Sequence, residues 1–351
     1  MPTEKYWNQK MVRAPEALAM MPRIPSVDDE IDWRGFDVAD LDTGCTRHSV
    51  YGPWQGDDSP IMQAARGQNL VEAGRLPFDP MDYKGFPGHG TRTQSVLCGA
   101  LPGKLMGTAP GLPTVPYRVT NSVVITSLRT QKRMAAAIQH AVDTARCEVV
   151  SISLGTPLLS AFNNPLGEAV DHAYERGVIV VGAGGQVIDR VTYPGKFFRS
   201  IGVGGVLPDR TVYMEYAPAD PDGNDTGDFI DVWAPADPIW RANSELIEGE
   251  VREAPYGTGD GTSYSAVQVA AAASMWLAFH GPQVIAEAYK KPWQRIEAFR
   301  KLLKATHSKV EGKYRPRNGT GILDIAALLQ AKLPAAKDLK QEKRLSAEQW
   351  G

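Results

Sequence analysis

The sequence predicts an α/β fold in which a doubly wound, mostly parallel β-sheet is flanked by helices. Short apolar runs rich in β-branched residues alternate along the chain with longer segments whose apolar residues recur at helical spacing. Residues 178–181 form a continuous run of Val and Ile, as expected of a parallel strand covered on both faces, and residues 200–206 repeat this pattern. Because such folds bind ligands at the carboxyl ends of their strands, polar residues at those ends are the first candidates for a site.

Each predicted strand is a short apolar segment bounded by turn residues. The first strand ends at Asp42, and the third carries the sequence VVSIS over residues 149–153. In chain order, the predicted strands cover residues 36–41, 114–119, 148–154, 178–181 and 200–206.

The predicted helices lie between and after these strands. Residues 132–145 place their apolar side chains on one stripe, and residues 263–279 are rich in alanine, which is typical of a buried helix. In chain order, helices are predicted near residues 14–21, 91–101, 132–145, 166–176, 263–279, 294–305 and 322–329.

The chain divides into three parts. Residues 1–33 are a largely irregular lead-in, residues 34–330 form the main domain, and residues 331–351 are a charged tail expected to form a loose or peripheral helix. With 351 residues, 43% of them hydrophobic, the chain is long enough for one large domain with a full core. Residues 46–87 are a long link rich in Gly, Pro and Asp, and links of that length usually have a function or fold back locally.

Composition excludes several classes of function. The 38 basic and 40 acidic side chains give a net charge of -2, so no nucleic acid partner is expected. The most apolar stretch, residues 266–279, is too short to span a bilayer, so no membrane association is expected either. Three cysteines do not suggest a disulfide framework. Residues 1–10 lack the apolar run of a signal peptide, which favours a cytoplasmic location, or a secreted one if Met1 was added to a mature domain.

Three short phrases supply an acid, a base and a nucleophile. They are Asp-Thr-Gly from Asp42, Gly-His-Gly-Thr around His89, and Gly-Thr-Ser ending at Ser263. A serine hydroxyl needs a base within hydrogen-bond reach, and the base needs a carboxylate to orient it. Ser263 opens a predicted helix, where its backbone N–H and the helix dipole favour a developing oxyanion.

The order Asp…His…Ser and the residues around each phrase resemble the subtilase, or subtilisin-like serine peptidase, family. The resemblance extends over residues 12–329 and implies a serine endopeptidase that acts through Asp42, His89 and Ser263, forms an acyl-enzyme, requires no cofactor, and takes a peptide or protein substrate. Further segments that match family landmarks are residues 107–110, 151–155, 177–185, 193–194, 201–204, 231–235 and 321–324.

The resemblance also assigns substrate-binding residues. Ser153, Leu154 and Gly155 are expected to pair with the substrate backbone as an added strand. Ala183, Gly184 and Gly185 are expected to line one wall of the S1 pocket. Thr192 falls where many members carry glycine at the pocket floor, which predicts a narrower pocket.

The chain departs from the family pattern at the oxyanion position. Gln186 stands where members normally carry Asn, and Gln carries the same amide donor on a stem one methylene longer. Arg92 replaces a second histidine after His89, while Val267 and Gln268 replace the usual Pro-His after the nucleophile.

Other family features are absent or altered. The mature-like sequence starts close to Met1 without a pro-domain, so a separately encoded inhibitor or chaperone is a possible partner. Residues 100–106 compress the loop that commonly holds calcium, and residues 220–225 only partly match a calcium loop. Acidic residues of the 46–87 link are expected to be solvated by default, so structural calcium stays an open alternative and no metal-ligating residue is assigned.

Two alternatives remain open. The chain could be a processing protease dedicated to one peptide or protein partner, with the 46–87 link controlling access. It could also be a non-catalytic binding protein with the subtilase fold, an interpretation that only Gln186 favours.

Overall fold

A parallel sheet forms the centre of the computed structural model, which describes residues 4–25, 30–157, 164–216, 229–312 and 320–344. Within these ranges the seven strands follow the order β2-β5-β1-β6-β7-β8-β9, and every neighbouring pair is parallel. The predicted fold class is therefore confirmed. The strands are β1 (Val38–Asp42), β2 (Gln68–Asn69), β5 (Thr114–Arg118), β6 (Val149–Ile152), β7 (Ile179–Ala183), β8 (Ile201–Val206) and β9 (Val232–Pro235).

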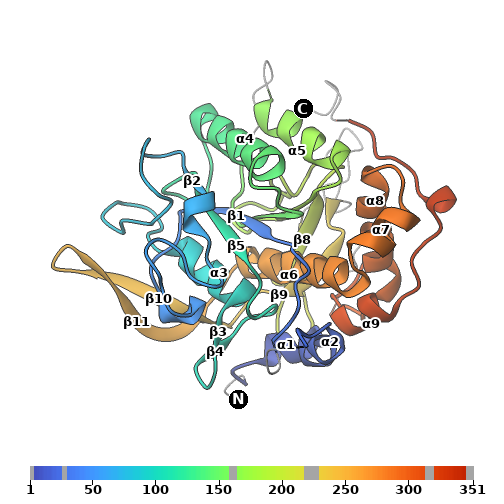
Figure 1. Ribbon diagram of the computed structural model, residues 1–351, viewed down its shortest axis with the longest axis horizontal. Helices are drawn as coiled ribbons and strands as arrows, with labels where there is room; N and C mark the ends of the chain where they lie inside the picture. Colours follow the sequence, from blue (N-terminus) through green and yellow to red (C-terminus); the bar gives the residue numbers. More distant parts are fainter. Residues whose placement is uncertain (1–3, 26–29, 158–163, 217–228, 313–319, 345–351) are drawn as a thin grey trace.

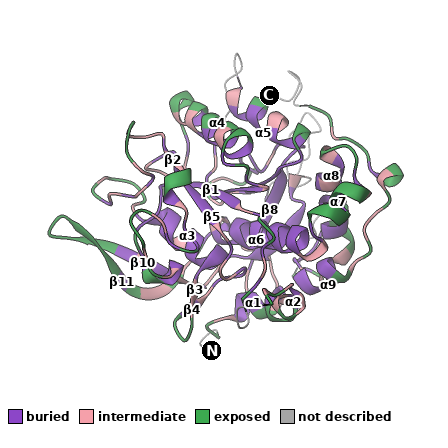
Figure 2. Ribbon diagram, in the orientation of Figure 1, coloured by how far each residue is buried: buried purple, intermediate pink, exposed green. Residues whose placement is uncertain are grey.

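Helices cover both faces of this sheet (Figure 1). On one face lie α3 (His89–Cys98) and α6 (Thr262–His280), and on the other lie α4 (Leu128–Asp143) and α5 (Pro165–Glu175). Alternate strand residues reach opposite cores: Val149 packs in the cluster of α6, whereas Val150 packs in the cluster of α4 and α5. Helix α6 crosses the middle of the molecule and is buried along nearly its whole length, as its composition predicts (Figure 2).

The remaining helices pack at the edges of this core. They are α1 (Trp7–Met11), α2 (Ala14–Met20), α7 (Pro282–Ala288), α8 (Trp293–Thr306) and α9 (Ile325–Gln330). At two predicted helices the observed start differs from the predicted one and is marked by a side chain that caps the first turn. Asp324 accepts a hydrogen bond from the Ala327 N–H and starts α9 at Ile325, while Ser127 accepts one from Thr130 and starts α4 at Leu128.

The two ends of the described chain pack on the core. In the lead-in, Trp7 Nε1 donates to the Pro238 carbonyl at 2.6 Å. The tail was predicted to form a loose or peripheral helix, and this is wrong for residues 332–344, which are extended apart from one 3-10 turn at Ala336–Asp338. Arg199 donates twice to the Glu342 carbonyl, and the Glu342 N–H donates to Tyr174, so side chains of the core hold the tail.

Two hairpins were not predicted. Residues 100–106, the compressed loop, form β3 (Ala100–Leu101) and β4 (Leu105–Met106). The longer hairpin pairs β10 (Ile239–Ile247) with β11 (Glu250–Gly259), and its outer half is exposed (Figure 2). It ends shortly before Thr262, the first residue of α6, so it leads directly to Ser263.

No single helix in the described ranges is long and apolar enough to cross a membrane. The pair α6 and α7 passes that test jointly, by length and composition only, with an 88° bend between the two helices.

Candidate active site

Asp42 and His89 are in direct contact. Asp42 is the last residue of β1 and is fully buried, and His89 is the first residue of α3. His89 Nδ1 lies 2.8 and 2.9 Å from the two carboxylate oxygens of Asp42. The carboxylate also accepts hydrogen bonds from the Thr43 N–H at 2.7 Å and the Thr93 hydroxyl at 3.3 Å. These contacts fix the imidazole orientation and leave Nε2 for another partner.

A second buried carboxylate links the chain segments that carry this pair. Asp79 Oδ2 accepts hydrogen bonds from the Thr43 hydroxyl (2.8 Å), the Tyr83 hydroxyl (2.9 Å) and the Gly88 N–H (2.8 Å). The Thr43 hydroxyl lies 3.1 Å from the Gly90 nitrogen, which donates to it. Asp79 therefore connects the residue after Asp42 to the residue before His89. The expectation that the acidic residues of the 46–87 link are solvated is wrong for Asp79, which is 2% exposed.

Glycines allow these two segments to approach closely. A Cβ at Gly90 would overlap the Gly44 carbonyl oxygen, and Gly44 itself has a φ of +102°, which side chains rarely adopt. The glycines of both phrases are therefore required for His89 to reach Asp42.

Asp40 lies behind the pair. It is two residues before Asp42 on β1, so both carboxyl groups lie on the same face of the sheet. Asp40 is fully buried, and its Oδ2 accepts a hydrogen bond from Gln94 Nε2 at 3.0 Å. Burial, with the nearby charge of Asp42, raises the pKa of Asp40 to about 8. Asp40 therefore keeps its proton to a higher pH than an ordinary aspartate does.

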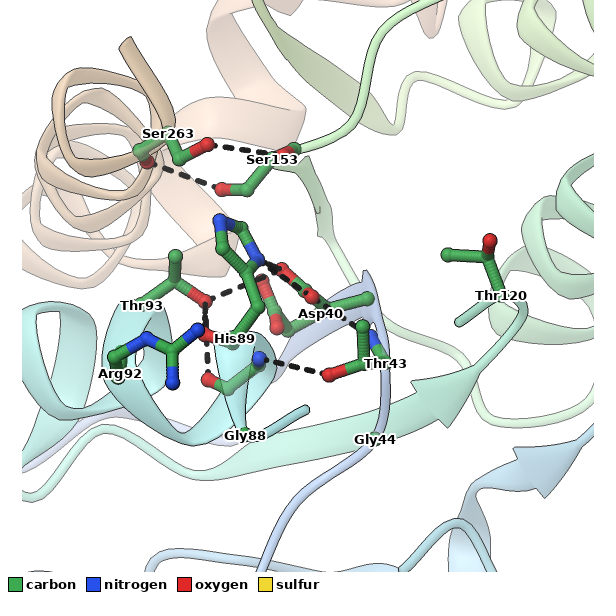
Figure 3. Close-up of polar contacts among 12 residues, drawn as sticks. Asp40, Thr43, Gly44, Gly88, His89, Arg92, Thr93, Thr120, Ser153 and Ser263 are labelled. Atoms are coloured by element: carbon green, nitrogen blue, oxygen red, sulfur yellow. Dashed lines mark hydrogen bonds and ion pairs between the residues drawn. The ribbon is translucent and has the colours of Figure 1, made fainter. Parts of the chain in front are cut away.

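Ser263 lies in the first turn of α6 and exchanges hydrogen bonds with Ser153. Its hydroxyl donates to the Ser153 carbonyl at 3.1 Å, and the Ser153 hydroxyl donates to the Ser263 carbonyl at 3.0 Å (Figure 3). In this arrangement the Ser263 hydroxyl is directed to a backbone carbonyl, and no hydrogen bond joins it to His89 in the described structure. Ser263 and His89 nevertheless line one cleft of about 350 Å³.

Gln186 borders this cleft and is held at the start of α6. Its Oε1 accepts hydrogen bonds from the Thr262 N–H at 2.8 Å and the Thr262 hydroxyl at 3.2 Å. Because the amide oxygen is occupied by these donors, the Nε2 group is the part of Gln186 left to donate to a ligand.

Of the residues predicted to form the S1 pocket, Ala183, Gly185 and Thr192 line the cleft. Thr192 is 7% exposed, and its hydroxyl donates to the Gly184 carbonyl at 3.2 Å. Its side chain fills the space that a Cβ at Gly155 or Gly185 would need. Gly184 is buried behind this wall and does not line the cleft.

The segment predicted to pair with substrate is already paired in part. The Gly155 N–H donates to the Val123 carbonyl at 3.0 Å, and the Gly155 carbonyl accepts from the Ile125 N–H at 2.8 Å. Residues 123–125 thus occupy one edge of Gly155, and Leu154 and Gly155 line the cleft beside Val123 and Val124.

Nothing in the described residues suggests a metal centre. No group of three or more His, Cys, Asp or Glu side chains is arranged to hold an ion. The partial calcium loop at residues 220–225 lies outside the described residues.

Sequence reasoning did not identify several residues around the site. Asp79 is a single aspartate in a loop, and Arg241, which lines the cleft, lies in an unpredicted strand, so neither belongs to a motif. Their positions at the site are set only when the fold brings distant segments together, although Asp79 stands ten residues before His89 in the sequence.

Comparisons with known proteins identify the family to which this fold belongs. A family model described as the subtilase family matches residues 27–320. An intracellular serine protease of Paenibacillus polymyxa is 24% identical over 329 residues, covering 91% of this chain and 88% of that protein.

Solved structures show the same fold. A protease from Pseudoalteromonas arctica has a TM-score of 0.66 at 21% identity, covering 91% of this chain and 93% of that one. MycP1 without its N-terminal propeptide has a TM-score of 0.63 at 18% identity, covering 93% and 98%. The prenylagaramide maturation protease PagA has a TM-score of 0.63 at 17% identity, covering 90% and 97%. The family match spans most of the chain, and the chain therefore belongs to the subtilase family of serine peptidases.

Proposed function

We propose that the chain is a serine endopeptidase that hydrolyses peptide bonds through Asp42, His89 and Ser263. One observation carries the proposal: a single cleft holds the His89 imidazole, backed by buried Asp42, together with the Ser263 hydroxyl at a helix N-terminus. This constellation supplies a base, its orienting carboxylate and a nucleophile.

In the proposed reaction, the Ser263 hydroxyl first leaves the Ser153 carbonyl. A rotation about its χ1 bond directs it to His89 Nε2, and a substrate N–H takes its place on the Ser153 carbonyl. His89 accepts the hydroxyl proton as Ser263 Oγ attacks the substrate carbonyl carbon, while Asp42 stabilises the imidazolium.

The tetrahedral intermediate places its charge at the start of α6. The Ser263 N–H and Gln186 Nε2 are the proposed oxyanion donors, and the helix dipole adds to their effect. His89 then gives its proton to the leaving amine, and an acyl-enzyme on Ser263 remains. Water, activated by His89, hydrolyses the acyl-enzyme and restores the hydroxyl, so the reaction needs no cofactor.

The walls of the cleft suggest the kind of substrate. Exposed Phe86 and Val187 border the polar centre, as expected of a site for polypeptide side chains. Thr192 closes the S1 end, so small residues are preferred before the scissile bond. Efficient cleavage after large aromatic residues in a peptide panel would contradict this preference.

Location and partners follow from the same proposal. The relative from Paenibacillus polymyxa is named an intracellular protease, which supports a cytoplasmic location for this chain. Its proposed partners are peptide or protein substrates, and neither nucleic acid nor a membrane is among them. A separately encoded inhibitor or chaperone could bind in the same cleft.

Labelling by a fluorophosphonate probe tests the proposal directly. Wild-type protein is expected to label, and Ser263→Ala and His89→Ala are expected not to. Thermal melting shows whether each variant is folded. A folded wild-type protein that does not label would contradict the proposal and favour a non-catalytic binding protein.

A second candidate is a processing protease dedicated to one partner. The pairing of Gly155 with residues 123–125 favours it, because an extended substrate cannot use that edge of Gly155 without displacing the chain's own segment. Labelling by the probe without cleavage of casein would support this candidate, and rapid casein digestion would exclude it.

A further inference from the structure

Two arginines line the cleft and come from elements other than those that carry the predicted S1 wall. Arg92 is three residues after His89 on α3 (Figure 3), and Arg241 belongs to β10. Both line the cleft that holds His89 and Ser263, and both are half-buried. The S1 wall follows β6 and β7, whereas these arginines come from α3 and the β10–β11 hairpin, which pack against each other.

The structure around them leaves both guanidinium groups without an anion. Arg92 Nη1 donates to the Pro87 carbonyl at 2.8 Å, and Arg241 Nη1 donates to the Ala242 carbonyl at 3.4 Å. Arg241 Nε is buried and has no hydrogen-bond partner within the described residues, and the polar side chain beside the Arg241 guanidinium group is the neutral Tyr264. Neither arginine forms an ion pair with any residue of the described ranges, although Arg118, Arg199 and Arg300 all do.

The two charges also act on each other. Burial, with the like charge of Arg241, lowers the pKa of Arg92. A bound anion between them would remove this repulsion and supply acceptors for their free N–H groups.

The other residues that line the cleft near these arginines add little negative charge. The backbone of Gly259 packs closely beside Tyr264 and Arg241, since a Cβ at this position would lie 2.6 Å from the Tyr264 hydroxyl and 3.0 Å from Arg241 Nε. The only carboxylate that lines the cleft within the described residues is Asp260, which is exposed and accepts a hydrogen bond from the Tyr213 hydroxyl at 2.7 Å. The arginines therefore keep an excess of positive charge here.

We propose that Arg92 and Arg241 form a cationic subsite for a carboxylate on the leaving-group side of the scissile bond. This inference rests on the proposed function, because the acyl part of the substrate is placed at the S1 wall and the leaving group then crosses α3 and the hairpin. The carboxylate is either an Asp or Glu side chain at the first or second leaving-group position, or the free C-terminus of a short leaving fragment.

Matched internally quenched peptides test the subsite. All peptides share the same residues on the acyl side of the scissile bond. Two pairs compare Glu with Gln, at the first or at the second leaving-group position. In a third pair the peptide ends two residues after the bond, either as a free acid or as an amide. Because opposite charges about 4 Å apart near a protein surface attract each other, we expect kcat/KM to be about tenfold higher for the preferred carboxylate peptide than for its neutral partner. This ratio is expected to fall at high salt, which screens the attraction. The pair with the largest ratio identifies the source of the carboxylate.

Variants assign the preference to the two arginines. Arg241→Gln and Arg92→Gln are each expected to reduce the carboxylate preference to about threefold or less, and the double variant to abolish it. Arg252→Gln is the matched control, since it removes the same charge from the same hairpin outside the cleft, where Arg252 pairs with Glu250. It is expected to keep the wild-type ratio. Equal kcat/KM values within every peptide pair, or an unchanged ratio in the double variant, would overturn the subsite.

A binding arm separates this inference from the proposed function. If the folded wild-type protein neither labels nor cleaves, the proposed function fails, and fluorescence anisotropy with the same peptides still reports on the arginines. Tighter binding of the carboxylate peptides that is lost in the double variant would support the subsite. Equal binding of both members of each pair would overturn it.

Discussion

The proposed acid–base half of the site, Asp42 and His89, differs from the proposed nucleophile half, Ser263 and Gln186, in how firmly it is held. Asp42 is fully buried and His89 is 8% exposed. Asp42 accepts hydrogen bonds from other buried groups besides His89, and buried Asp79 accepts one from the residue before His89. Ser263 and Gln186 are half-buried, and the Ser263 hydroxyl is bonded to a backbone carbonyl rather than to the base.

This difference indicates a division of work between the two halves. In the proposed reaction, Asp42 and His89 are already in contact before substrate binds, so no free energy is needed to bring them together during the reaction. The proposed nucleophile Ser263 would need only one rotation about a single bond, which a substrate would trigger by bonding to the Ser153 carbonyl. Substitutions in the acid–base half, which is the more rigid of the two, should therefore lower mainly kcat, because they misplace the base.

The largest effect is expected for Asp42→Asn. An amide at this position donates to His89 Nδ1, which forces the proton onto Nε2 and leaves no lone pair to accept the Ser263 proton. Loss of kcat by about 10⁴-fold is expected, with KM changed little. Hydrolysis of a cleaved peptide substrate measures it, normalised to folded protein. Activity within about tenfold of wild type would show that His89 is not oriented by Asp42.

The next effect tests the nucleophile half through Gln186→Ala. Removing one oxyanion donor is expected to lower kcat by about 10²–10³-fold. Gln186→Asn is the sharper variant, because a shorter side chain cannot both bond to Thr262 and reach the oxyanion. It is expected to be slower than wild type. A large gain in kcat for Gln186→Asn would mean that the longer side chain is poorly placed.

Much of this site could be predicted from local sequence. The apolar run of β7, the alanine-rich α6 and the three phrases carry short-range signals, because glycine turns and fully buried strands restrict which residues fit. The phrases also indicate which strand ends should meet, since parallel strands end at one edge of a sheet.

Other features depend on long-range contacts that no local pattern carries. β10 and β11 mix charged and apolar residues without clean alternation, and their pairing is set by a turn at Glu248 and Gly249 and by packing on α3. The tail lacks a helical stripe yet is ordered by Arg199 and Tyr174. An isolated aspartate in a loop, such as Asp79, is predicted from sequence to lie at the surface. Only the fold shows that three hydrogen-bond donors surround one of its oxygens.

A smaller effect is expected for Asp79→Asn, which tests whether Asp79 holds the acid–base half, Asp42 and His89, in place. The amide keeps the size of the side chain but turns an N–H₂ group toward donors from Thr43, Tyr83 or Gly88. His89 should shift slightly against Asp42, lowering kcat by about tenfold with KM within about twofold. We expect this loss in kcat when the rate is divided by the concentration of active sites titrated with the fluorophosphonate probe. This correction separates a misplaced His89 from partial unfolding of the protein.

Asp57→Asn is the matched control for Asp79. It changes an exposed aspartate in the same link, where Asp57 pairs with Arg47 at the surface. Its kcat is expected to equal that of wild type. An equal loss in both variants would mean that the whole link, rather than the Asp79 contacts, supports the base.

The smallest effect concerns Asp40 and is a pH-dependent change in stability. Its pKa is about 8 in the folded protein and near 3.8 in the unfolded chain, so the folded state binds more protons between these values. The free energy of unfolding contributed by Asp40 is therefore highest at acidic pH and falls as the pH rises to about 8. Asp40→Asn imitates the neutral carboxyl group and lacks this loss. Its Tm relative to wild type is expected to rise by about 2–4 °C between about pH 5 and pH 8.5. A Tm difference that is constant with pH would show that Asp40 is ionised in the folded protein, and that the rigid half tolerates two adjacent buried charges.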